Sequence, residues 1–236
     1  MNLFDRAREA ARLCRAAINL LHLPRARLEF KISISPKKIR AMYALFTRPH
    51  ARFPMIGNKT LGIALVDLSK FNKPDDYLAT VKKKDYAGHQ SQLAKRRGYT
   101  MRIIDRNDFI EDIYGINISA ETRQGRPMDA PYHERQTSYD IGPPFECFGI
   151  FNADDRLVAY CNVGVYGNFA STDKVLGYKN NDGVMLFLFT EIICRLITEN
   201  KLKYFMYDTY IGALPGLKDF KRRIGFAPYW ARYSIG

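Results

Sequence analysis

The C-terminal part of the sequence places several cations close together. The segment Leu214–Ile224 has helical spacing, and Gly225 after it is typical of a helix C-terminus. Lys218, Lys221 and Arg222 lie three or four residues apart within this segment, so the predicted helix presents them on one face. The end of the helix explains Gly225 whatever the function, whereas the three cations favour an anionic partner.

Two carboxylates stand beside predicted strands and are candidates for proton transfer. Asp208 ends the segment YFMYD, next to Tyr207, and Glu146 lies near the start of another strand. A carboxylate at the end of a strand can take a proton from a reacting group. Asp208 can equally cap the turn that follows it, so both interpretations of this residue stay open.

A turn-rich segment, residues 117–132, carries two arginines around a flexible glycine. Arg123 and Arg126 flank Gln124 in this segment. Two guanidinium groups close together suit a carboxylate or a phosphate. A surface loop with paired arginines explains the same residues equally well.

One predicted strand carries a polar and aromatic stripe. Tyr160, Asn162 and Tyr166 alternate along it, so they share one face. Together with Tyr207 they are candidates to line a pocket, although tyrosines also pack in cores with their hydroxyl groups at the rim.

Composition narrows the classes of protein. The chain has 236 residues, of which 47% are hydrophobic and 26% charged, which is typical of a globular protein. Its four cysteines are far apart, which argues against a zinc finger or a secreted disulfide framework and favours the cytoplasm. We find no Ser-His-Asp spacing, no metal-ligand cluster and no complete P-loop. The longest apolar run, residues 183–198, is too short and too charged to span a membrane.

The charge is uneven along the chain. The net charge is +13, and residues 1–100 contribute +14, residues 101–200 −6 and residues 201–236 +5. A basic first part predicts a polyanionic partner such as nucleic acid, an anionic membrane face or a phosphorylated cofactor. A solvated basic surface is the alternative. Within the basic segment 83–97, Tyr86 and His89 are interleaved with cations, an arrangement that can bind a phosphate backbone and stack bases.

The order of the predicted elements indicates a mixed sheet with helices. Residues 1–98 form a basic N-terminal region, and residues 99–236 form a regular α/β (α+β) domain. The predicted helices span residues 3–23, 36–47, 83–98, 107–118, 183–200 and 214–224. The predicted strands span residues 28–34, 61–68, 99–104, 147–151, 156–167, 175–178, 204–207 and 227–234, and residues 73–76 are predicted as a turn. An amphipathic transit peptide is an alternative for the first helix.

This order and the segment GLKDFKRRIGF, residues 216–226, resemble the GNAT (Gcn5-related N-acyltransferase) superfamily. The pair Phe220-Lys221, four to five residues before Gly225, is closer to its Fem-type branch, which includes the aminoacyl-tRNA-dependent peptidoglycan transferases. The resemblance covers residues 99–236 and implies a GNAT-like mixed central sheet flanked by helices. Residues 1–98 are then an extension or a decayed second GNAT-like unit.

The resemblance also implies a donor site before the helix at 183–200. CoA-dependent members bind pyrophosphate at a glycine-rich loop that opens this helix, through backbone N–H groups and the helix dipole. The donor-binding residues implied here are Tyr178, Lys179, Asn180, Asn181, Gly183, Lys218 and Arg222. The second glycine is missing, and Asp182 would repel phosphate. Many CoA-dependent members have, at the position of Lys221, a tyrosine that protonates the leaving thiolate. A lysine at this position can neutralise a developing negative charge.

The expected function is therefore transfer of an acyl group to an amine, with backbone N–H groups holding the oxyanion. The donor is a co-substrate and no cofactor is bound permanently; acyl-CoA is favoured, and aminoacyl-tRNA is the alternative. The acceptor is a small-molecule or peptide amine. Catalytic candidates are Asp208, Glu146 and Lys221, and acceptor-binding candidates are Arg123, Gln124, Arg126, Tyr160, Asn162 and Tyr207. A non-catalytic RNA-binding protein on the same scaffold is the second alternative.

Overall fold

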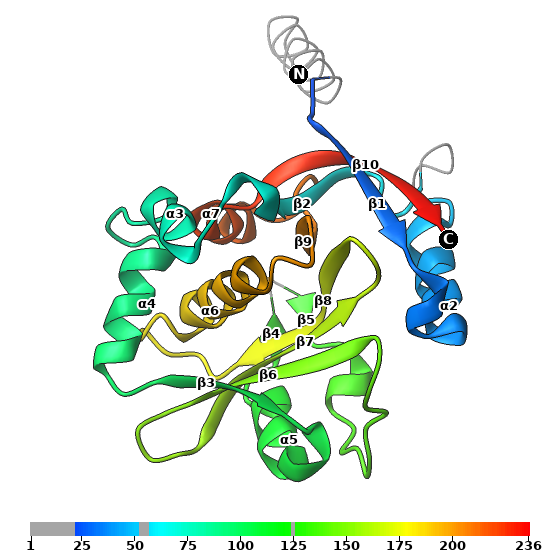
Figure 1. Ribbon diagram of the computed structural model, residues 1–236. Coiled ribbons are helices and arrows are strands. Elements are labelled where there is room, and N and C mark those ends of the chain that lie inside the picture. The colour runs from blue at the N-terminus through cyan, green and yellow to red at the C-terminus, as the bar shows by residue number, and fades with distance from the viewer. Residues whose placement is uncertain (1–21, 52–56, 124–125) are drawn as a thin grey trace, which may run out of the picture.

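The computed structural model describes residues 22–51, 57–123 and 126–236, with the backbone alone of Arg123 and Arg126. The helix predicted over 3–23 therefore falls, up to residue 21, outside the described residues. Eight strands form one mixed sheet in the order β1-β10-β2-β9-β8-β7-β6-β3 (Figure 1). These strands are β1 (Arg25–Phe30), β2 (Leu61–Asp67), β3 (Thr100–Ile104), β6 (Phe145–Phe151), β7 (Leu157–Val165), β8 (Phe169–Gly177), β9 (Tyr204–Thr209) and β10 (Ala227–Ile235). A separate two-stranded sheet pairs β4 (Thr122–Arg123) with β5 (Arg126–Pro127).

Helices cover both faces of the sheet. They are α2 (Pro36–Thr47), α3 (Pro74–Thr80), α4 (Ala87–Arg96), α5 (Ile110–Ile118), α6 (Val184–Glu199) and α7 (Pro215–Ile224). The long apolar helix α6 packs on one face with α3, α4 and α7 around it, and Val66, Phe148 and Phe205 of the strands belong to that core. On the other face, Leu65 and Met206 pack with α2, while Tyr160 and Leu176 pack with α5. Alternate side chains of each strand thus enter separate cores, as the pleat of a strand requires.

The middle of the sheet is splayed. Strands β8 and β9 run parallel and pair only from Phe169 with Tyr204 to Ser171 with Met206, although β8 continues to Gly177. A bulge at Asp173 interrupts the pairing of β8 with β7 near the same point. Bulges bend a strand, so the ends of β8 and β9 diverge, and side chains rather than backbone hydrogen bonds line the space between them.

The predicted fold class is confirmed, and most elements lie where the sequence places them. The helix at 36–47 has the predicted bounds, while the strand predicted at 175–178 starts earlier, at Phe169. The turn predicted at 73–76 is wrong, because Pro74 opens α3 and Asp75 and Asp76 occupy its first turn. Proline at the first position and acidic residues after it are what a helix N-terminus favours.

The predicted boundary at residue 98 does not separate two sheets. Strand β2, from the basic N-terminal region, lies between β10 and β9 of the C-terminal region. Helices α3 and α4, also from before residue 98, contact α6. Within the described ranges, no helix is long and apolar enough to cross a membrane.

Candidate active site

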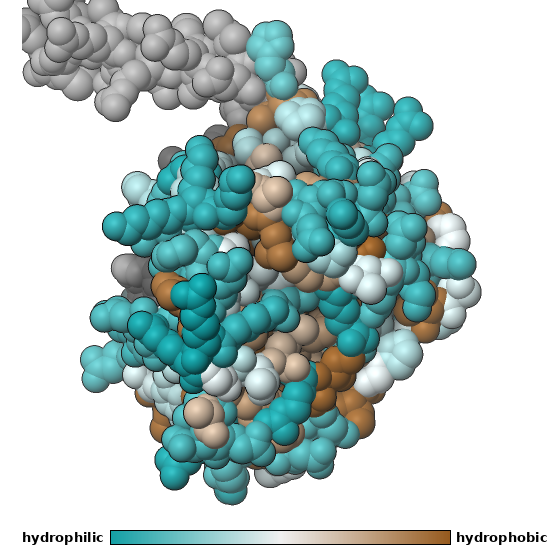
Figure 2. Space-filling view, turned by 60° about the vertical axis from the view of Figure 1, so that its left-hand side comes forward, coloured by the Kyte–Doolittle hydropathy of each residue, from teal (hydrophilic) through white to brown (hydrophobic). Residues whose placement is uncertain are grey.

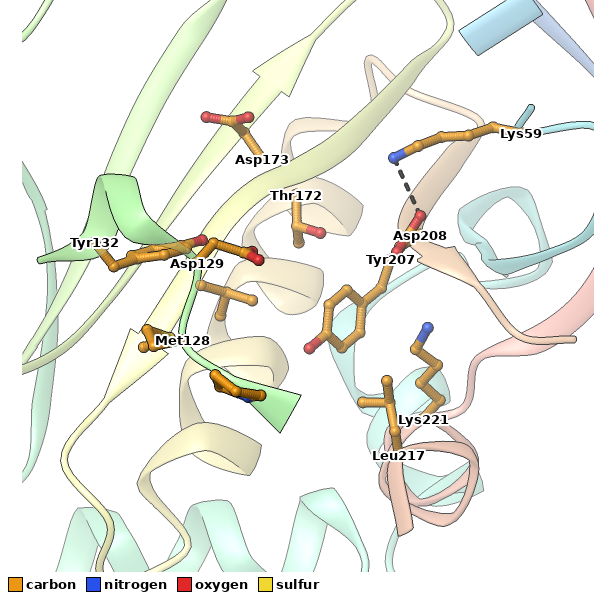
Figure 3. A pocket seen from close by; sticks show the side chains of 12 residues that line it. Lys59, Met128, Asp129, Tyr132, Thr172, Asp173, Tyr207, Asp208, Leu217 and Lys221 are labelled. Atoms are coloured by element: carbon orange, nitrogen blue, oxygen red, sulfur yellow. Dashed lines mark ion pairs between the residues drawn. The ribbon is translucent and has the colours of Figure 1, made fainter. Parts of the chain in front are cut away.

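The splay between β8 and β9 holds two adjoining pockets. The first, which we call the polar pocket, has a volume of about 180 Å³, and the second, the apolar pocket, about 240 Å³. Both are lined by Met128, Val175, Tyr207 and Leu217. Two binding spaces therefore meet at these side chains, and Figure 3 shows the Tyr207 ring standing between Met128 and Leu217.

Charged side chains gather in the polar pocket. Its lining includes five of them, from five different segments: Lys59, Asp129, Asp173, Asp208 and Lys221. Pro127, Tyr132 and Thr172 complete it with the four shared residues. In Figure 3, Asp208 and Lys221 lie on one side of the pocket and Asp129 and Asp173 on the other.

Lys221 is the most buried of these charges, with 1% of its surface exposed. Its Nζ atom donates to the backbone oxygen of Thr209 at 2.5 Å and lies 4.6 Å from the centre of the Tyr207 ring. Burial lowers the pKa of Lys221 to about 8; Asp208 opposes this shift and Lys59 adds to it. At pH 7 the group is thus still mostly protonated, but it can release its proton within the physiological range.

Asp208 lies at the mouth of the same pocket. Its carboxylate pairs with the ammonium group of Lys59 at 3.1 Å, and 58% of its side chain is exposed. The backbone of Asp208 is left-handed, with φ of 50°, a conformation that aspartate adopts more readily than most residues. The turn of the chain at this point places the carboxylate at the pocket with Lys59 rather than along the strand.

Among the side chains that the structure describes, which exclude those of Arg123 and Arg126, no charged one lines the apolar pocket. Besides the shared residues, it is lined by Ile116, Ser119, Ala120, Thr122, Leu176, Gly177, Met185 and Phe220. Met185 belongs to the first turn of α6 and Gly177 ends β8, so this pocket reaches the start of α6.

The start of α6 is where the implied donor loop lies. Gly183, with φ of 74°, precedes the helix, and Tyr178, Lys179, Asn180 and Asn181 are exposed in the loop before it. Asp182 accepts from the Arg97 guanidinium at 2.5 Å and from the Tyr99 hydroxyl at 2.7 Å. Burial and the Asp182 bond raise the pKa of Tyr99. A carboxylate is thus held in front of the helix N-terminus by two partners.

Two further donor-binding candidates lie on α7. Arg222 is exposed and pairs with Asp219 at 2.5 Å, and Lys218 is half-buried. Both lie on the same helix as Leu217 and Phe220, which line the apolar pocket. The donor-binding candidates thus lie on α7 and before α6, on elements that contribute to the apolar pocket, but none of them lines it.

The second base candidate, Glu146, lies away from Asp208 and Lys221. It lines another pocket, of about 270 Å³, with Arg106 and Cys147. Burial raises the pKa of Glu146, and Arg195, at 3.9 Å, opposes the shift. The structure therefore brings together two of the three catalytic candidates and leaves the third outside the splayed site.

Some acceptor-binding candidates lie at the two pockets, and another lies in the core beneath α5. Tyr207 lines both pockets, and Asn162 donates to the carboxylate of Asp173 at 3.0 Å and so holds a polar-pocket group in place. Tyr160 is buried, and its hydroxyl donates to Asn117 at 2.7 Å beneath α5.

The predicted arginine pair belongs to the small sheet next to the pockets. Arg123 pairs with Arg126 across β4 and β5 through the backbone, while both side chains, and Gln124 entirely, lie outside the described residues. Pro127, which ends β5, and Met128, which follows it, line the polar pocket.

Sequence reasoning missed Lys59, Met128, Asp129, Thr172 and Asp173. The signal in the sequence is slight: Met128 and Asp129 fall in the turn-rich segment, and Asp173 gains its position from a bulge. Lys59 carries no local signal, because only the insertion of β2 beside β9 brings it to Asp208.

Comparison with known proteins supports the fold. No protein-family model and no curated protein matches the chain. FemX shares the fold at a TM-score of 0.50 and 12% identity, over 71% of this chain and 59% of FemX. The C-terminal domain of a putative lysylphosphatidylglycerol synthetase from Agrobacterium fabrum gives a TM-score of 0.49 and 18% identity, over 70% of this chain and 57% of that one. The chain thus spans less than two thirds of the length of these structures, and it shares its GNAT-like fold with FemX.

Proposed function

We propose that the protein is an acyltransferase that moves an acyl group from an activated donor to an amine. The observation that carries this proposal is the pair of pockets in the splay between β8 and β9, which meet at Tyr207 beside the buried Lys221. The apolar pocket suits an uncharged acyl group, and the polar pocket suits an amine that must lose a proton. Both substrates then meet at the residues that the pockets share.

The mechanism follows from the charges around Tyr207. The acceptor amine attacks the acyl carbonyl, and the Asp208 carboxylate takes the proton that the amine must lose. Negative charge develops on the carbonyl oxygen and then on the leaving group. The Lys221 ammonium, already held by the Thr209 oxygen, stabilises this charge in a site largely shielded from water. The nitrogen–carbon bond of the amide forms as the bond from the carbonyl carbon to the donor oxygen breaks, and that oxygen takes its proton from the Lys221 ammonium, which regains one from the proton that the amine has given up.

The donor is better matched by aminoacyl-tRNA than by acyl-CoA. A CoA pyrophosphate would need the N-terminus of α6, where phosphate gains from the helix dipole and free N–H groups. Asp182 stands there instead, held by Arg97 and Tyr99. A carboxylate repels phosphate, so the proposal departs from acyl-CoA, the donor that the sequence favours.

A base-stability assay tests this function across several amine acceptors at once. The purified chain is incubated with a ¹⁴C-aminoacyl-tRNA pool or with ¹⁴C-acetyl-CoA, and with a panel of amines that includes lysine, a diamine and a dipeptide. Mild alkali then hydrolyses the ester and thioester donors but leaves an amide intact. We expect a ¹⁴C-labelled amide, separated by chromatography from the free labelled acid, from the tRNA donor with at least one amine. The absence of such an amide with both donors would refute the function.

A further inference from the structure

One strongly basic surface is not used by the mechanism above. It is formed by the turn between α3 and α4 and by the outer side of α7, and its members are Lys82, Lys83, Lys84, Tyr86, Lys218 and Arg222; we call it the basic surface. We infer that it docks the sugar-phosphate backbone of an RNA beside the apolar pocket. The inference deepens the proposed function and rests on it for the role of that RNA as donor.

The two halves of the basic surface are joined by specific contacts. Arg222 of α7 donates to the hydroxyl of Tyr86, and its guanidinium lies 5.1 Å from the centre of the Tyr86 ring. The Lys83 ammonium lies 5.9 Å from the same ring. Segments 136 residues apart in sequence are thus brought into one surface with an aromatic side chain between two cations.

The surface keeps an excess of positive charge. Lys82, Lys83 and Lys84 are exposed in succession, and Asp85 is the single carboxylate that follows them before Tyr86. On α7, Asp219 pairs with Arg222 and with Arg223, at 2.5 and 2.6 Å, so one carboxylate is shared between two guanidinium groups. The positive charges therefore outnumber the negative ones on both halves.

This combination fits RNA better than a small anion. Consecutive exposed lysines offer several separate phosphate contacts, and such contacts supply most of the affinity of a nucleic-acid backbone site. Tyr86 contacts both Lys83 and Arg222 and so holds cations of the two halves in place for such contacts. Large exposed apolar side chains, which insertion into a lipid surface would need, do not occur between Lys82 and Arg97, all of which the structure describes; at the other half of the surface, Ile211 and Leu214 are exposed just before α7 and are too few for such an insertion.

The location of the basic surface links it to the reaction. On α7, Leu217 and Phe220 line the apolar pocket, whereas Lys218 and Arg222 lie on the outer side of the same helix, because consecutive helix residues point about 100° apart. Helix α4 lies against α6 and α7, so the basic surface borders the pocket from outside. Figure 2, which brings the side of α3 and α4 forward, shows hydrophilic side chains projecting around a hollow with apolar side chains inside it. A single-stranded RNA end held on the basic surface therefore has to reach around α7, a helix about 10 Å across, to enter the pocket proposed for its acyl group.

The test measures RNA affinity with matched charge deletions. A fluorescein-labelled RNA hairpin with a single-stranded 3′ end is titrated with the full chain, and anisotropy is followed at several salt concentrations. One variant carries Lys82→Gln, Lys83→Gln and Lys84→Gln. The control variant carries Lys37→Gln, Arg40→Gln and Lys201→Gln, which remove three exposed charges outside the basic surface.

We expect the first variant to bind about tenfold or more weakly at about 100 mM salt, and its slope of log affinity against log salt to fall by about 2, since each phosphate contact contributes about 0.7–0.9. The control variant should stay within about threefold of the wild type. Equal losses in the two variants, or no binding by the wild type at low salt, would overturn the inference.

The titration needs no acyl transfer, so the two proposals fail separately. RNA binding through Lys82–Lys84 without base-stable product from any donor would leave the basic surface standing and refute the acyltransferase. Base-stable product from the tRNA donor, with equal activity in both triple variants at limiting RNA concentration, would refute the basic surface alone.

Discussion

The polar and the apolar pocket share four side chains but differ in almost every other property. Of the side chains described in the structure, five charged ones line the polar pocket and none lines the apolar pocket. The charged lining comes from segments that lie far apart in sequence, whereas most of the apolar lining comes from α5, β8, α6 and α7. One side of Tyr207 is thus equipped to move protons and stabilise charge, and the other to hold an uncharged group in position.

The two pockets should therefore respond to different kinds of substitution. Substitutions that alter charge should act through the polar pocket, because a buried cation and a carboxylate are worth most where water is excluded. Substitutions that alter shape should act through the shared residues, where the two substrates must approach.

The largest effect should come from Asp208, the base in the polar pocket. We expect Asp208→Asn to lower the rate of amide formation about 10³-fold, because an amide cannot accept the amine's proton. The free energy of unfolding in urea should change by less than about 1 kcal/mol, since the Asp208 side of its pair with Lys59 is 58% exposed. Glu146→Gln is the control, because Glu146 is a carboxylate outside the pocket, and it should leave the rate unchanged. A large loss of rate in Glu146→Gln and none in Asp208→Asn would show that Glu146 is the base.

The buried charge of Lys221 should appear in stability as a function of pH. Its folded-state pKa is lowered from the ordinary 10.5 to about 8, so burying the charge destabilises the protein below pH 8. Between pH 8 and 10.5 the unfolded chain keeps a proton that the folded chain has released, so stability rises with pH in this window. The gain relative to Lys221→Met should be on the order of 3 kcal/mol. Urea unfolding of both proteins at about pH 7 and about pH 10 measures it, and a difference that does not change with pH would contradict the buried charge.

The junction of the pockets should be sensitive to shape. Leu217→Trp adds bulk where both pockets meet, and we expect transfer to fall about 10²-fold because the substrates can no longer approach. RNA affinity should be unaffected. Leu214→Trp is the control, because Leu214 precedes the same helix and is 52% exposed. Full transfer by Leu217→Trp would show that the pockets do not form one channel.

The outer end of the apolar pocket should give the smallest effect. Asp182→Asn removes the carboxylate at the start of α6 and frees Arg97, so free CoA should bind up to about tenfold more tightly. Calorimetric titration measures this, with Asp154→Asn in the exposed turn between β6 and β7 as the control. Tight CoA binding by the wild type, unchanged in Asp182→Asn, would favour acyl-CoA as the donor.

The contrast between the pockets also explains how far the sequence could predict the site. The segment 216–226 carries local signals of helix, cap and basic face, so α7 and Lys221 could be singled out. Lys59 and Asp173 could not, because their positions depend on β2 entering the sheet beside β9 and on a bulge in β8. Glu146 and Asp208 look alike in sequence, and only the folded chain separates them: Glu146 faces Arg195 of α6, whereas Asp208 turns toward Lys59.

Much of the fold is predictable because its elements carry local patterns. Amphipathic or apolar periodicity and clear caps mark α2, α6 and α7, and the predicted bounds of each lie within a few residues of the observed ones. Pairing between distant strands has no such local signal, so the single sheet built from both sides of residue 98 could not be foreseen.

Lys221 is the group that we expect to stabilise charge at the junction of the two pockets during transfer. Single-turnover amide formation by wild type and Lys221→Met, each saturated with ¹⁴C-aminoacyl-tRNA, tests this role most directly because donor binding no longer limits the rate. We predict a rate about 10²–10³-fold lower in Lys221→Met with unchanged RNA affinity, and a wild-type rate in the exposed control Lys201→Met. Equal rates in wild type and Lys221→Met would contradict this role.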